Sequence, residues 1–111
     1  DQTFAAVSHV PHLLAFAQVN GLMNQPEGEA FLQLAGPGFR DFSRIAASDP
    51  AVWRDILSAN RTEVLAQLAH FRASLAQFEA AMQQGDTTGL QQLIQQASDV
   101  RSGWSLQAGN G

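Results

Sequence analysis

The chain opens with a helix-forming stretch that reads, from Thr3 to Asn24, TFAAVSHVPHLLAFAQVNGLMN. Its apolar side chains occur on nearly every side of a helix, which predicts burial from several directions. Thr3 is the expected N-cap of this helix. Pro11 has no backbone N–H, so we expect a kink there and a carbonyl of Val7 without its helical partner.

The rest of the chain is also predicted to be helical, because β-branched residues are sparse and no stretch alternates with period two. We expect further helices at residues 29–35, 39–47, 50–59, 64–84 and 88–104. Asp49 is an expected N-cap, with Pro50 at the first helical position. Residues 60–63 (NRTE) resemble a capping box and predict a break. The sequence therefore predicts an all-α domain of about five or six helices.

The longest of these helices carries a heptad pattern. Its apolar residues fall at positions 64, 68, 71, 75, 78 and 82. This alternation of four- and three-residue steps is typical of a seam that packs against another helix. The polar tail from Gln107 to Gly111 is expected to be frayed.

Composition excludes several classes of protein. The 111 residues suit one domain, and we expect a piece of a longer polypeptide because the chain begins with Asp1. Charged residues make up only 14%, against about 25% in typical domains. Either the chain is compact with an exterior of Gln, Ser and Ala, or it buries a face against something else. The net charge of −4 argues against a nucleic-acid partner. Polar residues within the first helix argue against a membrane span, and cysteine is absent.

Two histidines flank the proline of the first helix. His9 and His12 are three residues apart and lie on one face. His9 could satisfy the backbone carbonyl that Pro11 leaves free, and His12 is the better candidate for a ligand contact. A metal site would need a third ligand, for which His70 is the candidate. A metal-binding bundle that uses these three histidines is therefore a further, less favoured alternative.

A second polar segment follows a glycine-rich turn. Arg40 and Arg44 are one helical turn apart, and Asp41 is spaced to form an ion pair with Arg44. Both arginines stand among apolar residues, where a guanidinium suits a carboxylate. Residues 36–38 (GPG) lack the spacing, the preceding strand and the lysine of a phosphate loop. Tryptophan at a position like that of Trp53 is more often a core or interface residue. Together with Trp53, these groups suit a pocket for an anionic, ring-shaped ligand.

Three segments together resemble the C-terminal helical domain of the prephenate/arogenate dehydrogenase family. They are residues 6–15 (AVSHVPHLLA), 38–46 (GFRDFSRIA) and 48–56 (SDPAVWRDI), followed by Asn60. The resemblance covers about residues 1–80, while Arg101 and Trp104 match loosely. It implies that residues 1–111 form a dimerisation and substrate-binding domain, and that an N-terminal Rossmann domain is absent from this chain.

The resemblance also implies an activity. Such enzymes oxidise and decarboxylate prephenate or arogenate with NAD or NADP, in the cytoplasmic synthesis of tyrosine. The Rossmann domain would bind the dinucleotide and supply the histidine that accepts the hydroxyl proton. We therefore expect no catalytic residue and no metal ligand in this chain, which alone would be inactive.

Residue roles follow from the same resemblance. His12, Arg44, Asp41, Trp53 and Gly38 are expected to line the substrate pocket, with Arg44 holding a carboxylate and Trp53 approaching from the second subunit. Pro37 stands where members of the family often have glycine. The residues expected to support the pocket are Ser8, His9 and Arg40.

The family forms intertwined homodimers, which agrees with the low charge and the heptad pattern. The alternative is a purely structural dimerisation module or a regulatory module that senses tyrosine. In either case we expect no nucleic-acid partner and no membrane partner.

Overall fold

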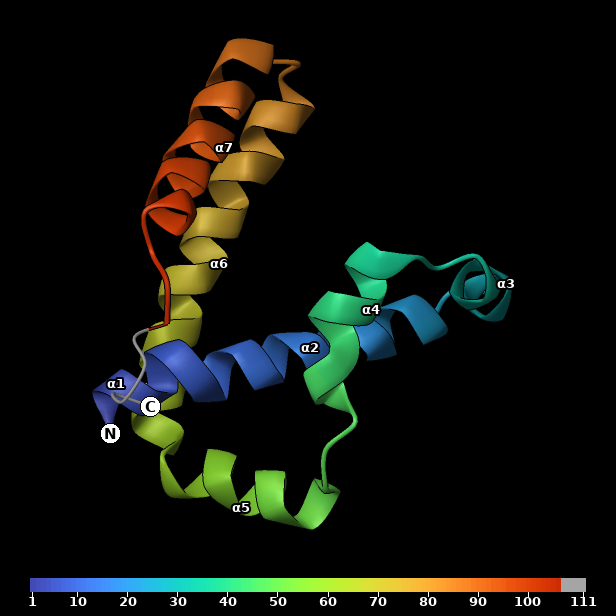
Figure 1. Cartoon of the computed structure of the whole chain (residues 1–111), viewed down its shortest axis with the longest axis vertical. Coiled ribbons are helices and arrows are strands. Elements are labelled where there is room, and N and C mark those ends of the chain that lie inside the picture. The colour runs from blue at the N-terminus through green and yellow to red at the C-terminus, as the bar shows by residue number, and fades with distance from the viewer. Residues whose placement is uncertain (107–111) are drawn as a thin grey trace. The chain divides into compact units, whose positions relative to one another are not determined.

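The computed structural model describes residues 1–106 and is built from helices, as the sequence predicts (Figure 1). The expected fraying beyond Gln107 concerns residues outside this range. The elements are α1 (Gln2–Phe4), a π-helical segment (Ala5–His9), α2 (Val10–Met23), α3 (Gly28–Gln33), α4 (Pro37–Ser43), a 3-10 segment (Arg44–Ala46), α5 (Pro50–Ala59), α6 (Arg61–Gln83) and α7 (Thr87–Ser102). The chain divides into two compact units, Asp1–Ala69 and a second that begins at His70.

The first helix departs from expectation at its start. Its N-cap is Asp1, whose carboxylate accepts a hydrogen bond of 2.9 Å from the backbone N–H of Phe4. The prediction of Thr3 as the cap was wrong, because the aspartate two residues earlier already caps the first turn. Ahead of Pro11 the backbone widens into a π-helical turn, in which the N–H of Val10 bonds to the carbonyl of Ala5. Such a turn is one way a helix accommodates a proline that cannot donate.

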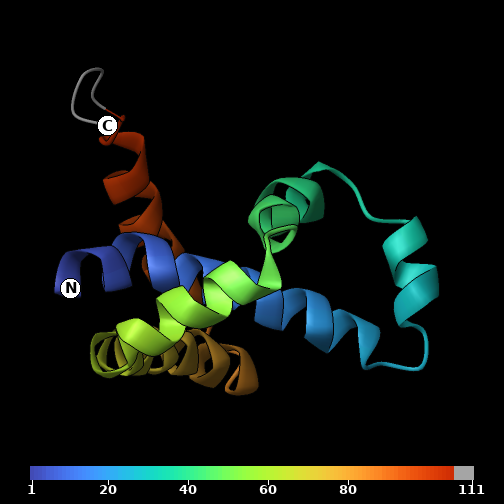
Figure 2. The same cartoon turned by 90° about the horizontal axis from the view of Figure 1, so that it is seen from below.

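Three short elements pack against α2 within the first unit. These are α3, α4 and the 3-10 segment. Figure 1 shows α4 crossing α2, and Figure 2 shows α3 beside the C-terminal end of α2. The expected helix over residues 39–47 begins earlier, because Pro37 serves as its first residue. Gly28 at the start of α3 is buried against the end of α2, where only glycine leaves room for the Leu22 carbonyl.

The beginning of α5 confirms the sequence prediction. The Asp49 carboxylate accepts hydrogen bonds from the backbone N–H groups of Ala51 and Val52, at 2.9 and 3.0 Å. Pro50 occupies the first helical position. This cap fixes where α5 begins, one helical turn before Trp53.

The hydrophobic core of the first unit is small. Ala5, Val10 and Val64 are buried, and the partly buried Leu13, Leu14 and Leu57 pack around them. Among the described residues, no large side chain is fully buried. Several large apolar side chains are instead more than half exposed, including Phe4, Val7, Leu34, Phe42, Val52 and Leu65. A unit of this kind leaves apolar surface for a partner.

The second unit is a hairpin of the end of α6 with α7. The turn between them is a Schellman motif, in which Asp86 N–H bonds to the Ala81 carbonyl and Gly85 N–H to that of Met82. Gly85 has a φ of 64°, which glycine adopts without strain. The heptad residues Leu75 and Met82 are mostly exposed. Among the described helices, none is both long and apolar enough to cross a membrane.

Candidate functional site

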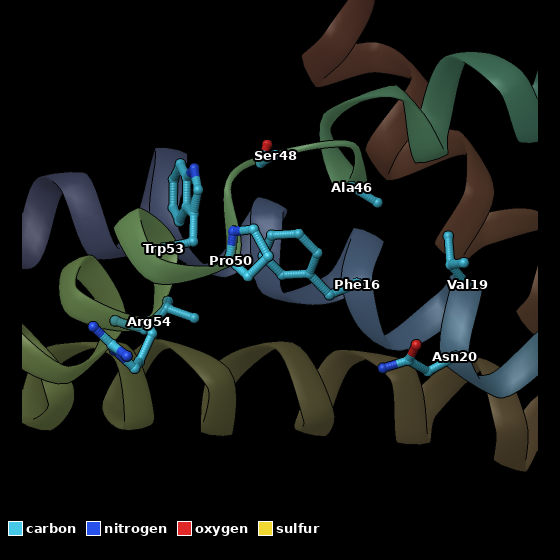
Figure 3. Close-up of a pocket in the computed structure, with 9 residues that line it drawn as sticks. Phe16, Val19, Asn20, Ala46, Ser48, Pro50, Trp53 and Arg54 are labelled. Atoms are coloured by element: carbon cyan, nitrogen blue, oxygen red, sulfur yellow. The ribbon is translucent and has the colours of Figure 1, made fainter.

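The first unit contains a pocket between α2 and α5. Its volume is about 360 Å³, and its walls are mainly apolar with a few polar groups. The lining residues are Phe16, Val19 and Asn20 from α2, Ala46 and Ser48 from the connection after α4, and Pro50, Trp53, Arg54 and Leu57 from α5 (Figure 3). This combination is typical of small-molecule sites.

Trp53 forms one wall of the pocket and is held by aromatic contacts. Its indole stacks on the imidazole of His12, with ring centroids 3.7 Å apart and planes 16° from parallel. Phe16 meets the same indole edge-on at 6.3 Å, and His9 does so at 6.2 Å. The structure thus brings His12 into contact with Trp53. Of the predicted site residues, only Trp53 lines this pocket; His12, Gly38, Asp41 and Arg44 are not among its lining residues.

His12 is also bound to the backbone of its own helix. Its Nδ1 atom donates to the carbonyl oxygen of Ser8, 2.9 Å away. His9 was one candidate partner for the Val7 carbonyl that Pro11 leaves free; its Nδ1 atom instead lies next to Asn60.

His9 bonds to a different part of the chain. The Nδ2 atom of Asn60 lies 3.3 Å from His9 Nδ1 and 2.8 Å from the carbonyl oxygen of Asp1. Asn60 is the residue between α5 and α6. Its side-chain amide therefore binds the start of the first helix, which differs from the local capping-box bond that the sequence suggested.

The charged residues of the second polar segment lie on the surface. Arg40 and Asp41 form an ion pair with each other at 3.2 Å, and their side chains are 73% and 72% exposed. The expected pair between Asp41 and Arg44 is not formed; Asp41 pairs with its neighbour Arg40 instead. Arg44 is exposed. Gly38 is not in a close contact that requires glycine, because a Cβ atom added there would have no neighbouring atom within 4 Å.

His9, His12 and His70 were the candidate ligands of a metal site. Within residues 1–106, no three His, Asp or Glu side chains are grouped closely enough to hold a metal ion. His9 and His12 are instead engaged with Asn60 and the Ser8 carbonyl. These hydrogen bonds fix the orientation of both imidazole rings.

Sequence analysis missed several residues of this site. Phe16 and Asn20 follow His12 at intervals of four residues, and this helical spacing could have identified them. Ser48 and Arg54 flank the predicted start of α5, and the hydroxyl of Ser48 donates to the Ile45 carbonyl at 2.6 Å. No local pattern predicts that these two side chains line the same pocket.

Comparison with known proteins gives a consistent result. Residues 1–96 match the family model described as prephenate dehydrogenase, dimerization domain. The chain is 31% identical to a prephenate dehydrogenase of Bacillus subtilis, over 96% of this chain and 29% of that protein. It is 35% identical to a cyclohexadienyl dehydrogenase of Zymomonas mobilis, over 78% of this chain and 31% of that protein. The chain spans about a third of the length of these relatives.

Two solved structures resemble the fold. One is prephenate dehydrogenase from A. aeolicus in complex with hydroxyphenyl propionate and NAD+, with a TM-score of 0.83 and 36% identity. The other is Synechocystis arogenate dehydrogenase, with a TM-score of 0.85 and 27% identity. Each match covers 92% of this chain, and 36% and 38% of the respective solved chains.

Proposed function

The chain belongs to the family of prephenate dehydrogenase dimerization domains, and from that premise we propose that it serves a dehydrogenase as both dimer interface and part of the substrate pocket. The complete enzyme would oxidise and decarboxylate prephenate or arogenate in the cytoplasm. NAD or NADP, when bound, would accept hydride from the ring carbon that bears the hydroxyl. The present chain has no glycine-rich nucleotide loop, so the dinucleotide would be held mainly by a further domain.

The observation that carries this proposal is the stack of His12 on Trp53 beside a partly apolar pocket. The ring of a cyclohexadienyl acid presents apolar faces, and its carboxylates require a cation and hydrogen-bond donors. Support also comes from the A. aeolicus relative, which binds an aromatic carboxylic acid together with NAD+. The pocket has the chemistry for such a ligand.

Each predicted residue receives a role in this proposal. Trp53 lines the pocket, and His12 stacks on it. Gly38, Arg44 and Asp41 do not line the pocket in this chain; in the complete enzyme His12 and Gly38 would meet the substrate ring, and Arg44 with Asp41 would form the charged mouth of the site. Arg44 is free of the Arg40–Asp41 pair, which leaves its guanidinium available for a substrate carboxylate. The residues that would support these groups are Ser8, His9 and Arg40.

A second copy of the chain would cover the exposed apolar surface. A core of so few buried residues is small for a stable monomer, and the exposed heptad residues supply an apolar seam. Sedimentation equilibrium of this chain is expected to give a dimer at micromolar concentration and below. A folded monomer at high concentration would contradict the proposal.

Activity is tested in the complete enzyme. NADH or NADPH formation is measured with prephenate and with arogenate, beside a His12→Ala variant that dimerises normally. We expect turnover of one or both substrates and a strongly reduced kcat/KM for the variant. Equal kcat/KM for the two enzymes would exclude a role of His12 in substrate binding and favour a purely structural or tyrosine-sensing role.

A further inference from the structure

The Asn60 side chain connects the beginning of the first helix with the junction of α5 and α6. It donates to the Asp1 carbonyl and reaches the imidazole of His9, which in turn meets Trp53 edge-on. We propose that Asn60 is a positioning residue that holds His9 against Trp53 and fixes the His9 tautomer opposite to that of His12, which the Ser8 carbonyl sets. The consequence for substrate binding rests on the proposed function, whereas the tautomers do not.

The orientation of the Asn60 amide follows from its partner. A backbone carbonyl can only accept hydrogen bonds, so the side-chain atom 2.8 Å from the Asp1 oxygen must be the amide nitrogen. That nitrogen carries a second proton, and His9 Nδ1 lies 3.3 Å from it. His9 must therefore accept at Nδ1, which places its own proton on Nε2 when the ring is neutral.

His12 is subject to the opposite constraint. Its Nδ1 lies 2.9 Å from the Ser8 carbonyl oxygen, which again can only accept. His12 must therefore carry its proton on Nδ1, and the lone pair of the neutral ring is on Nε2. A hydroxyl of a ligand could donate to this lone pair, or the protonated ring could donate to a carboxylate.

Trp53 lies between these two histidines in the network. His12 stacks on its face and His9 meets it edge-on. Release of His9 from Asn60 would remove one of the contacts that orient the indole. Because the indole forms one wall of the pocket, the shape of the pocket would change with it. Asn60 would therefore act on a ligand through His9 and Trp53, without touching the ligand.

The tautomers are measured by NMR of the histidine ring nitrogens in this chain. We expect a protonated Nε2 in His9 and a protonated Nδ1 in His12. The reverse assignment for either ring, or equal populations in His9, would overturn the proposal. This measurement needs no variant, so it decides the matter even if a substituted chain fails to fold.

Asn60→Asp tests the cause, because it keeps the shape but presents only acceptors. The carboxylate should draw the His9 proton to Nδ1, while His12 keeps its tautomer. Asn24→Asp adds the same charge at the exposed end of α2 and should leave both rings unchanged. An unchanged His9 in Asn60→Asp would show that another group sets its tautomer and would overturn the inference.

The effect on the pocket is measured in the complete enzyme. Asn60→Asp is expected to raise KM about tenfold with a smaller change in kcat, the size of one lost hydrogen bond. Normal KM with an altered His9 tautomer would overturn the positioning role. If the unsubstituted enzyme turns over neither prephenate nor arogenate, the proposed function fails, while the NMR result still decides the role of Asn60 toward His9.

Discussion

The imidazole of His12 and the indole of Trp53 stack at 3.7 Å and so join α2 to α5. Figure 3 shows Trp53 of α5 and Phe16 of α2 among the residues that line the pocket between these two helices. Aromatic stacking contributes about 0.5–1.5 kcal/mol beyond the burial of area. The pair therefore matters for the stability of the unit as well as for its proposed ligand.

Replacement of Trp53 should reveal both contributions. Trp53→Leu is expected to lower the free energy of unfolding by about 1–2 kcal/mol, because it removes the stack and part of the buried area. Trp53→Phe keeps an aromatic ring and should lose less. Urea denaturation measures the difference, and the NMR shifts of the His12 ring protons report the loss of the indole. Equal stability of all three proteins would show that the stack contributes nothing.

The cap of α5 gives a second prediction. Asp49→Ala removes the acceptor of two backbone N–H groups and should cost about 1 kcal/mol of unfolding free energy. Asp49→Asn keeps a capping oxygen and should restore most of it. Asp55→Ala is the control, because Asp55 forms only an exposed ion pair with Arg54. A similar loss for both alanine variants in urea denaturation would contradict the capping role.

Two glycines of the first unit should respond in opposite ways to alanine. Gly28→Ala places a Cβ against the Leu22 backbone carbonyl and should destabilise the fold by at least about 1 kcal/mol. Gly21→Ala lies within α2 and meets nothing nearby. It should stabilise the chain by about 0.5–1 kcal/mol through helix propensity. Thermal unfolding measures both, and the same sign for both variants would contradict the packing at Gly28.

The fold could be predicted from the sequence wherever local chemistry decides it. Asp49 and Pro50 are the preferred residues at a helix start, and the structure confirms their position. The π-helical turn could not be predicted, because a missing N–H at Pro11 is compatible with several backbone solutions. The sequence pattern predicts a local capping box at Asn60, whereas its side-chain amide donates a hydrogen bond to the Asp1 carbonyl, far away in the sequence.

The candidate site divides in the same way. Spacing places His9 and His12 on one helix face, and both meet Trp53. Trp53 and its neighbour Arg54 come close to the residues of α2 only because of the way in which α5 packs against α2. That packing follows from loops and from apolar contacts spread over both helices, which no short motif encodes.

The exposed arginine of the 3-10 segment gives the last prediction. Arg44→Ala in the complete enzyme should raise KM for prephenate by at least about tenfold with a smaller loss in kcat, because a charge-assisted contact to carboxylate contributes about 1.5–3 kcal/mol. Arg44→Lys should recover only part of this, since an ammonium cannot form the two parallel bonds of a guanidinium. Arg72→Ala removes the same charge from an exposed position of α6 and should change neither constant. A fall in kcat at constant KM would instead assign Arg44 to the chemical step and contradict a role in binding.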